Sequence, residues 1–251
     1  MLAHFSAFLY IIQSMLEIKN LTKSFYDGKP VVKNLNLTVK DGEVFGFLGL
    51  NGAGKTTTVK MVADLLFPDK GTIKIGKFDH TNLKAKEQIG FMPETPQFYQ
   101  HLKASEVVEF AGELFGQEKV ALKKTADKLL EQVGLGKSKD LPARKFSKGM
   151  HQRLAFAVAL VNNPKLLVLD EPLDGLDPIG RLDFKRLIMD MKKQGKAVFL
   201  SSHILSDVEE LCDRVAILQN GEIIVIDEPK KLLKKGQTLE ECFVEKVRTK
   251  K

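Results

Sequence analysis

The stretch Gly49-Leu50-Asn51-Gly52-Ala53-Gly54-Lys55-Thr56-Thr57 decides the fold of this chain. It matches the pattern G-x-x-x-x-G-K-[ST] in full, and it lies between a strand-like apolar run at 43–48 and helical spacing at 55–66. The glycines allow the backbone to curl and present N–H groups to an anion, and the start of the helix adds partial positive charge. The stretch therefore predicts a phosphate-binding loop between a buried strand and a helix.

Two side chains of this loop suit a nucleoside triphosphate and its metal ion. The Lys55 ammonium neutralises the β- and γ-phosphates, so it serves both binding and catalysis, and the Thr56 hydroxyl is a ligand for Mg²⁺. A chance match to the pattern is about a 1 in 100 event for a chain of this length, and the strand–loop–helix setting makes it rarer. We therefore predict that residues 49–57 bind ATP and Mg²⁺.

Two adjacent carboxylates, Asp170 and Glu171, follow the apolar run at 166–169. Strand ends line one edge of a parallel sheet, so Asp170 is expected near the phosphate loop, holding Mg²⁺ directly or through water. Glu171, one residue later, points elsewhere and is expected to polarise the attacking water as a general base. The alternative is an acidic cap of the next helix, which the complete phosphate loop disfavours.

Hydrophobic periodicity places these motifs in an α/β fold. Alternating residues at 15–21 and 35–39 predict an antiparallel sheet at the start, with turns at Asp27-Gly28 and Asp41-Gly42. Helical spacing from 105 to 134, without an intervening strand, predicts a helical subdomain inserted at about 95–160.

The core resumes after this insertion. Strand-like runs at 166–169 and 197–200 flank a helical segment at 181–193, which indicates a largely parallel sheet. Asn220-Gly221 then predicts a hairpin. The expected fold class is α/β, with a P-loop NTPase core, a mainly parallel sheet, an N-terminal antiparallel β-subdomain and an inserted helical subdomain.

Composition bounds the class of protein. The chain has 251 residues, of which 43% are hydrophobic and 28% charged, as is ordinary for a soluble protein. The net charge is +7, but the lysines are scattered, which favours a generally basic surface over a nucleic-acid site. Two distant cysteines, Cys212 and Cys242, fit a reducing cytosol. The sequence contains no run of about eighteen apolar residues, so it predicts no membrane-spanning helix.

The expected domain boundaries follow from the same patterns. We interpret residues 1–14 as an extension outside the fold, because Met15 immediately precedes the first strand-like segment; a short membrane-surface anchor is the alternative. Residues 15–235 form the expected nucleotide-binding domain. Residues 236–251 are interpreted as a basic C-terminal tail with a frayed end.

The segment Phe146-Ser147-Lys148-Gly149-Met150 places a Ser hydroxyl and a Gly N–H at a predicted helix start, where an anion is favoured. Alone it indicates an ordinary Ser cap. Taken with the phosphate loop and the carboxylate pair, it makes the chain from about 15 to about 228 resemble the nucleotide-binding domains of ATP-binding cassette (ABC) transporters, of the exporter type. The family signature is usually Leu-Ser-Gly-Gly-Gln, so Ser147 and Gly149 match and Phe146, Lys148 and Met150 depart. The resemblance implies that Ser147 and Gly149 clamp a γ-phosphate held by a second subunit.

The resemblance implies roles for three more residues. Asp177 matches the family's D-loop, although Asp before Pro is also an ordinary helix cap. His203, in Ser201-Ser202-His203, matches the switch histidine that contacts the γ-phosphate and holds the attacking water. Phe25 falls where the family places an aromatic that stacks on adenine; Tyr26 is an alternative, and a core aromatic is another interpretation of Phe25.

The clearest departure from the family is Glu94, in Phe91-Met92-Pro93-Glu94, where Gln is usual. In the family this Gln approaches Mg²⁺ and water, and its loop senses the membrane partner. A carboxylate does the same with one more negative charge, which tightens Mg²⁺ or slows hydrolysis. We therefore include Glu94 with Thr56 and Asp170 as residues for the metal.

The resemblance implies an ATP-hydrolysing subunit that energises transport, with export favoured, by a separate transmembrane permease. Two nucleotide-binding domains, as a homo- or heterodimer, are expected to pair head to tail at the cytoplasmic face of the membrane. The alternative is a soluble ABC ATPase acting on nucleic acid or ribosomes, but no second cassette, coiled coil or zinc-binding insertion is visible, so no nucleic acid is expected. A regulator without turnover is disfavoured by the presence of Glu171 and His203.

Overall fold

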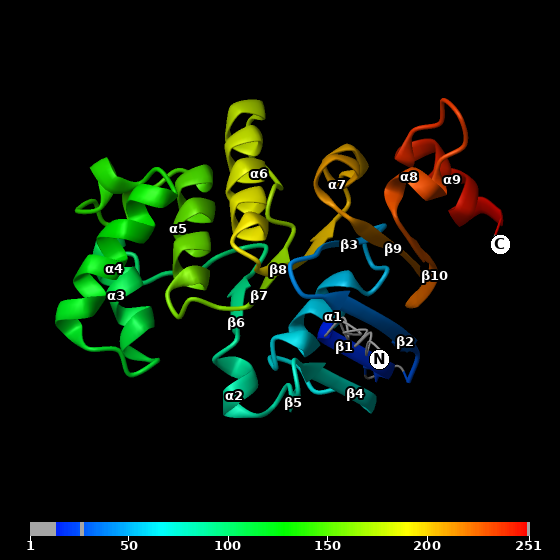
Figure 1. Cartoon of the computed structure of the whole chain (residues 1–251), viewed down its shortest axis with the longest axis horizontal. Helices are drawn as coiled ribbons and strands as arrows, with labels where there is room; N and C mark the ends of the chain where they lie inside the picture. Colours follow the sequence, from blue (N-terminus) through cyan, green and yellow to red (C-terminus); the bar gives the residue numbers. More distant parts are fainter. Residues whose placement is uncertain (1–13, 26–27, 250–251) are drawn as a thin grey trace, which may run out of the picture.

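The strands form two sheets (Figure 1). The computed structural model describes residues 14–25 and 28–249. The smaller sheet is antiparallel, with the order β2-β1-β4-β5. It consists of β1 (Ser14–Ser24), β2 (Pro30–Lys40), β4 (Lys70–Ile75) and β5 (Phe78–Asp79).

The larger sheet has the order β10-β9-β3-β8-β7-β6, and it is parallel except at β10, which runs antiparallel to β9. The strands β3, β7 and β8 are buried along their whole length, as their apolar runs predict. Because these strands are parallel, their carboxyl ends meet at one edge. The bounds are β3 (Val44–Gly49), β6 (Ile89–Met92), β7 (Leu166–Asp170), β8 (Ala197–Ser202), β9 (Arg214–Gln219) and β10 (Glu222–Asp227).

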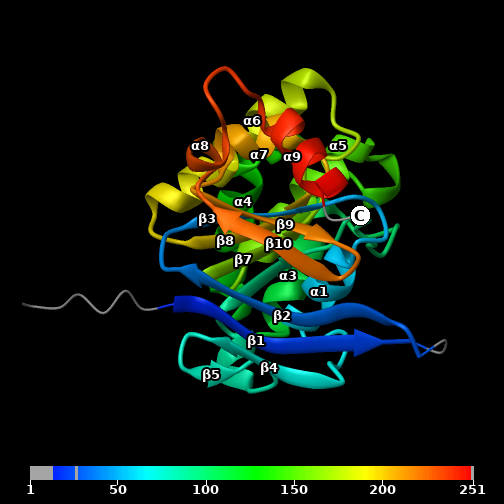
Figure 2. The same cartoon turned by 90° about the vertical axis from the view of Figure 1, so that its right-hand side faces the viewer.

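Two apolar cores lie on either side of the larger sheet (Figure 2). Along β3, Phe45 and Phe47 face the core shared with the smaller sheet and α1 (Lys55–Val62), whereas Val44 and Leu48 face the other core. This alternation follows from the period of two residues in a strand. Most of the remaining helices cover that second face: α3 (Ala104–Glu113), α4 (Lys119–Gln132), α5 (Lys148–Leu160), α6 (Pro178–Lys193), α7 (Leu205–Leu211), α8 (Pro229–Leu232) and α9 (Leu239–Thr249).

The helices α3, α4 and α5 lie together at one end of the molecule (Figure 1). They follow β6 and precede β7, so they form an insertion between two neighbouring strands of the larger sheet. The predicted fold class is confirmed: an α/β core with a mainly parallel sheet, an N-terminal antiparallel sheet and a helical insertion. A short helix, α2 (Leu83–Lys86), connects β5 to β6.

The helix after the phosphate loop is shorter than the sequence predicts. We expected it to reach residue 66, but α1 ends at Val62. Asp64 takes a positive φ of 56°, and the Leu65 amide donates to the Lys60 carbonyl at 2.8 Å. This left-handed turn closes the end of the helix.

The interpretation of residues 236–251 as a frayed basic tail is wrong for α9. Leu239, Cys242 and Phe243 are spaced three and four residues apart, so they share one face of this helix, and all three are buried. The Leu239 amide also donates to the Glu209 carboxylate of α7 at 3.2 Å. Charged residues of both signs on the outer face separate the members of this apolar stripe, which anchors the helix.

Three other sequence predictions fall partly or wholly outside the described residues. The extension predicted at 1–14 lies outside them except for Ser14, which is the first residue of β1. Tyr26, the alternative aromatic for adenine, also lies outside, as does Asp27 of the first predicted turn. Within the described part of the chain, no helix combines the length and the apolar character that crossing a membrane requires.

We predict that Phe243→Ala lowers the free energy of unfolding by about 3 kcal/mol, because it removes a buried aromatic side chain from the core. The neighbouring Val244 is 40% exposed, so Val244→Ala is the matched control and should change stability by about 0.5 kcal/mol or less. Urea unfolding followed by circular dichroism measures both. Equal stability of the two variants would mean that α9 does not anchor to the core.

Candidate functional site

The phosphate loop runs from the end of β3 to the start of α1. Gly52 and Gly54 have φ of 80° and 106°, a left-handed backbone that glycine adopts without steric cost. Gly54 also packs against β2, since a Cβ atom there would lie 2.7 Å from the Val31 carbonyl oxygen. The nearly buried Lys55 folds back over the loop, and its Nζ donates to the Gly49 carbonyl at 2.8 Å.

A hydrogen bond to the β9–β10 hairpin holds the loop in place, and the hairpin is bonded to the smaller sheet. The Gly221 amide, in the turn between β9 and β10, donates to the Ala53 carbonyl at 3.0 Å. The Gly221 carbonyl accepts from the Lys33 amide of β2 at 2.8 Å. The loop is therefore bonded to the β9–β10 hairpin, which is in turn bonded to the smaller sheet.

Asp170, the last residue of β7, lies next to Thr56, as its position at the strand end predicts. The Thr56 hydroxyl is 3.5 Å from Asp170 Oδ1, and the Ser201 hydroxyl donates to the same oxygen at 2.6 Å. Burial raises the pKa of the Asp170 carboxyl above its usual value, while the hydrogen bonds from Ser201 and Thr56 act in the opposite direction. A hydroxyl beside a carboxylate is an oxygen donor set that fits Mg²⁺.

Glu171 contacts the other two predicted catalytic residues. Its Oε1 is 3.3 Å from Lys55 Nζ, and its Oε2 is 2.9 Å from His203 Nδ1. The His203 amide also donates to Oε2, at 3.2 Å. Glu171 has a positive φ of 47°, rare for this residue type, and its own amide donates to the Ser201 hydroxyl at 3.0 Å. The chain turns sharply at Glu171 and so directs its carboxylate at Lys55 and His203.

Lys55, Thr56, Glu171 and His203 line one cavity of about 500 Å³. Glu94 lies on its wall, and the loop that carries Glu94 is bonded to α5, because Gln152 Nε2 donates to the Glu94 carbonyl at 3.2 Å. The structure thus brings most of the predicted nucleotide and metal residues together, although their roles stay predictions. The lining residues are Val31, Asn51, Gly52, Gly54, Lys55, Thr56, Thr57, Glu94, Glu171, Asp174 and His203.

The remaining loop residues lie around this cavity without lining it. Gly49 is buried at the end of β3, where a Cβ would lie 2.8 Å from the Leu218 carbonyl oxygen. Leu50 is exposed, and Ala53 is buried and accepts the hydrogen bond from Gly221. Asp170 is buried at the end of its strand.

Four of the residues assigned by resemblance lie outside the cavity of their own chain. Ser147 caps α5 by accepting from the Met150 amide at 3.3 Å, and Asp177 caps α6 by accepting from the Gly180 amide at 2.6 Å. Gly149 is half-buried in the first turn of α5, and both caps are exposed. Phe25 is 44% exposed, so it is not a core aromatic, and the ammonium of Lys23 is 5.9 Å from its ring centroid.

Sequence reasoning gave no individual role to three residues that shape the cavity. Asp174, within the D-loop segment, lines the cavity, and its Oδ2 is 3.0 Å from Lys148 Nζ. Because Asp174 is charged and lies three residues after Glu171, the sequence could have indicated that it lies near the site. Val31 and Gln152 carry no signal in the sequence, because their positions follow only from tertiary contacts.

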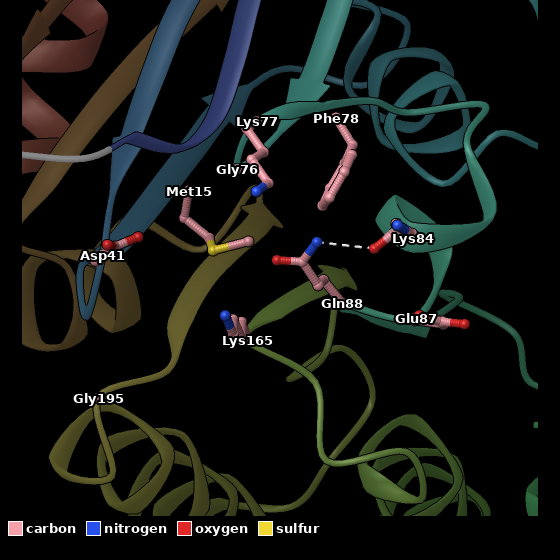
Figure 3. A pocket seen from close by; sticks show the side chains of 10 residues that line it. All are labelled: Met15, Asp41, Gly76, Lys77, Phe78, Lys84, Glu87, Gln88, Lys165 and Gly195. Atoms are coloured by element: carbon pink, nitrogen blue, oxygen red, sulfur yellow. Dashed lines mark hydrogen bonds between the residues drawn. The ribbon is translucent and has the colours of Figure 1, made fainter.

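A larger cavity, of about 800 Å³, lies at the opposite edge of the parallel sheet (Figure 3). Lys165 and Gly195 on its wall precede β7 and β8, so this cavity faces the amino ends of these strands. Ligands of open parallel sheets bind beyond the carboxyl ends instead. Among the described residues that line it, none belongs to a predicted site: Met15, Asp41, Gly76, Lys77, Phe78, Lys84, Glu87, Gln88, Lys165 and Gly195.

Comparison with known proteins agrees with this geometry. A family model described as ABC transporter matches residues 32–174, a range that holds the phosphate loop and the carboxylate pair. The chain belongs to the ABC transporter family. It is 41% identical over 227 residues to the uncharacterized ABC transporter ATP-binding protein YxlF of Bacillus subtilis (strain 168), covering 89% of this chain and 74% of that protein.

Two other relatives carry functional names. The bacitracin transport ATP-binding protein BcrA of Bacillus licheniformis is 41% identical over 218 residues, covering 85% of this chain and 69% of BcrA. The linearmycin resistance ATP-binding protein LnrL of Bacillus subtilis (strain 168) is 38% identical over 214 residues, covering 84% of this chain and 68% of LnrL.

Solved structures of ABC subunits share the fold. One, described as the ATP binding subunit of an ABC transporter, has a TM-score of 0.84 and 30% identity, covering 93% of this chain and 99% of its own. Another is an ATP-binding cassette solved as a dimer in a post-hydrolysis state with ADP and Pi. It has a TM-score of 0.78 and 26% identity, covering 85% of this chain and 98% of that chain. The present ABC protein is an ATP-binding subunit and an ATPase.

We predict that Lys55→Ala weakens ATP binding by roughly ten- to a hundred-fold, because a charge-assisted contact to phosphate is lost and Glu171 faces the phosphates unneutralised. Lys60→Ala, which removes an exposed lysine of the same helix, is the control and should bind normally. Isothermal titration calorimetry with ATP measures both affinities. Unaltered affinity of the Lys55 variant would refute the phosphate-loop assignment.

Proposed function

We propose that this ABC subunit powers export through a separate transmembrane permease, working at the cytoplasmic face of the membrane, and that it hydrolyses ATP between two cassettes paired head to tail. The observation that carries the hydrolytic part is the contact of Glu171 with both Lys55 and His203 at the wall of the phosphate-loop cavity.

In this proposal Glu171 is the general base. Its Oε2 is held by the ring and the amide of His203, and its Oε1 faces the Lys55 ammonium. The carboxylate is thereby fixed in orientation, as a base that accepts a proton from a positioned water must be. His203 is partly exposed at the cavity wall, where it contacts the γ-phosphate and holds that water. Lys55 neutralises the phosphate charge that hydrolysis rearranges.

The proposed metal residues are Thr56, Asp170 and Glu94. Thr56 and Asp170 would hold Mg²⁺ between the start of α1 and the end of β7, and Glu94 would face it across the cavity. When bound, Mg²⁺ would neutralise phosphate charge. Thr56 and Asp170 are kept side by side by the Ser201 hydroxyl, which donates to Asp170 from the neighbouring strand β8.

The exposed positions of Ser147 and Asp177, with the half-buried Gly149 beside Ser147, support the pairing of two cassettes. None of the three lines the cavity of its own chain, yet Ser147 and Gly149 present a hydroxyl and a helix start that attract an anion. A second cassette, identical or related, would bring its nucleotide to this surface. Phe25 is exposed enough to stack on adenine, and this contact is part of the proposal.

An apolar groove of about 460 Å³ supports a protein partner beside the helical insertion. Phe98, Tyr99, Phe110 and Leu114 line it, and all but Phe98 are exposed. The groove begins at Gln97, three residues after Glu94, which lines the nucleotide cavity. A short amphipathic helix of the permease fits such a groove and would contact the segment that carries Glu94.

The direction of transport is proposed from two relatives. One is named for bacitracin transport and the other for linearmycin resistance, and resistance is consistent with removal of the compound from the cell. We extend that direction to this chain because it shares 41% and 38% of residues with these proteins over most of its length.

We predict that Glu171→Gln retains ATP binding but lowers kcat at least about a hundred-fold, because the amide keeps the shape of the side chain and cannot accept the proton. Asp190→Asn makes the same acid-to-amide change on the exposed face of α6 and should leave kcat unchanged. Phosphate release at saturating ATP and Mg²⁺ measures both variants. Hydrolysis like that of the unaltered protein would remove Glu171 from the role of base.

We predict that Leu114→Asp abolishes co-purification with the permease from detergent-solubilised membranes while basal ATPase activity persists, because a charge in the groove opposes apolar docking. Val120→Asp, at an exposed apolar residue of α4 outside the groove, is the control and should retain the partner. Normal co-purification of the Leu114 variant would contradict docking in this groove. Sedimentation of the protein with ribosomes or DNA instead of membranes would favour the alternative function, a soluble ABC ATPase that acts on nucleic acid or ribosomes.

A further inference from the structure

Asp207 is a buried carboxylate outside the nucleotide cavity. Its side chain is 5% exposed, and each of its oxygens meets a different cation of α6. Arg181 Nη2 contacts Oδ2, and Lys185 Nζ is 2.9 Å from Oδ1. Arg181 and Lys185 are four residues apart and so lie one above the other on the same helix face. An unpaired buried charge costs several kcal/mol, so the two cations of α6 that pair with Asp207 hold α7 on α6.

A fourth charge completes the cluster. Lys185 Nζ also contacts Glu210, three residues after Asp207 on α7. Burial lowers the pKa of Lys185, but its hydrogen bonds to Glu210 and Asp207 outweigh this effect and raise the pKa above its usual value. Arg181, Lys185, Asp207 and Glu210 form what we call the α6–α7 ion cluster, with two positive and two negative charges.

The α6–α7 ion cluster lies between the segments that follow the proposed catalytic residues. The helix α6 begins at Pro178, after the loop that leaves Glu171, and α7 begins at Leu205, two residues after His203. The helix α7 has only seven residues, a length that does not hold its position without tertiary contacts. The cluster therefore fixes the first turn of α7, and with it the chain that leaves His203.

We propose that Asp207 is a positioning residue for hydrolysis: by holding α7 on α6, the α6–α7 ion cluster keeps the His203 imidazole against Glu171. The inference rests on the proposed function of Glu171 and His203. Asp207 does not line the nucleotide cavity, so it acts only through the position of His203. An error of about 1 Å in the position of a catalytic group costs up to about a hundred-fold in rate, which sets the scale of the effect.

The first test compares Asp207→Asn with the unaltered protein. The asparagine keeps the size of the side chain and removes the charge that binds Arg181 and Lys185. We expect kcat to fall by roughly ten- to a hundred-fold with the KM for ATP unchanged, because the phosphate loop keeps its contacts. Asp207→Glu retains a carboxylate and should recover much of the lost kcat. Unchanged kcat in a folded Asp207→Asn variant would overturn the inference.

A double-mutant cycle with His203→Ala separates positioning from general stability. If Asp207 acts through His203, Asp207→Asn lowers kcat in the unaltered protein but adds no further loss to His203→Ala. Additive losses would overturn the inference. Turnover of His203→Ala like that of the unaltered protein would instead contradict the proposed function of His203, so the two failures are distinguishable.

Controls address folding and the loss of charge itself. Lys193→Met removes a cation from the last turn of α6, where it pairs with the exposed Asp190, and should leave kcat unchanged. Arg181→Gln leaves Lys185 bound to Asp207 and provides a milder variant if Asp207→Asn fails to fold; its kcat should fall in the same direction. Circular dichroism verifies the fold of each variant. Unchanged kcat in folded Arg181→Gln would likewise count against the positioning role.

Discussion

The contact between the Lys55 ammonium and the Glu171 carboxylate is the interaction on which the site depends. Both side chains are nearly buried, and an unpaired charge so placed costs several kcal/mol, so each side chain compensates the burial of the other. Lys55 follows β3 and Glu171 follows β7, two strands separated in the sheet by β8, and His203 follows β8. The site therefore exists only when three parallel strands are aligned at their carboxyl ends.

One hydroxyl organises the acidic side of this site. Ser201 Oγ donates to the Asp170 carboxylate and accepts from the Glu171 amide, so it bonds to two successive residues with different roles. It also supports the positive φ of Glu171, a strained backbone that turns the carboxylate toward Lys55 and His203. Burial raises the pKa of Asp170, and Glu171 next to it has a strained backbone. Both features destabilise the fold locally, and such features concentrate at functional sites.

How far the sequence predicts this molecule depends on how local each feature is. The phosphate loop and the strand ends at Asp170 and His203 were predictable, because a contiguous motif and parallel topology suffice to bring them together. Gln152 and Asp207 were not, because each acquires its contact only from a distant element. The residues of α9 were misread because the basic residues at the end of the chain drew attention away from the spacing of Leu239, Cys242 and Phe243. Pairing with a second cassette remains a prediction, since it concerns surfaces rather than the fold of one chain.

The hydrogen bonds that fasten the phosphate loop to the β9–β10 hairpin, and through it to β2, have a consequence for the end of the catalytic cycle. A loop that is already rigid before the nucleotide binds loses little conformational entropy on binding. The same amides then grip a diphosphate as readily as a triphosphate, so unwinding of the loop offers no route for product discharge. We therefore expect the release of product to depend on groups at the mouth of the cavity rather than on a change in the loop.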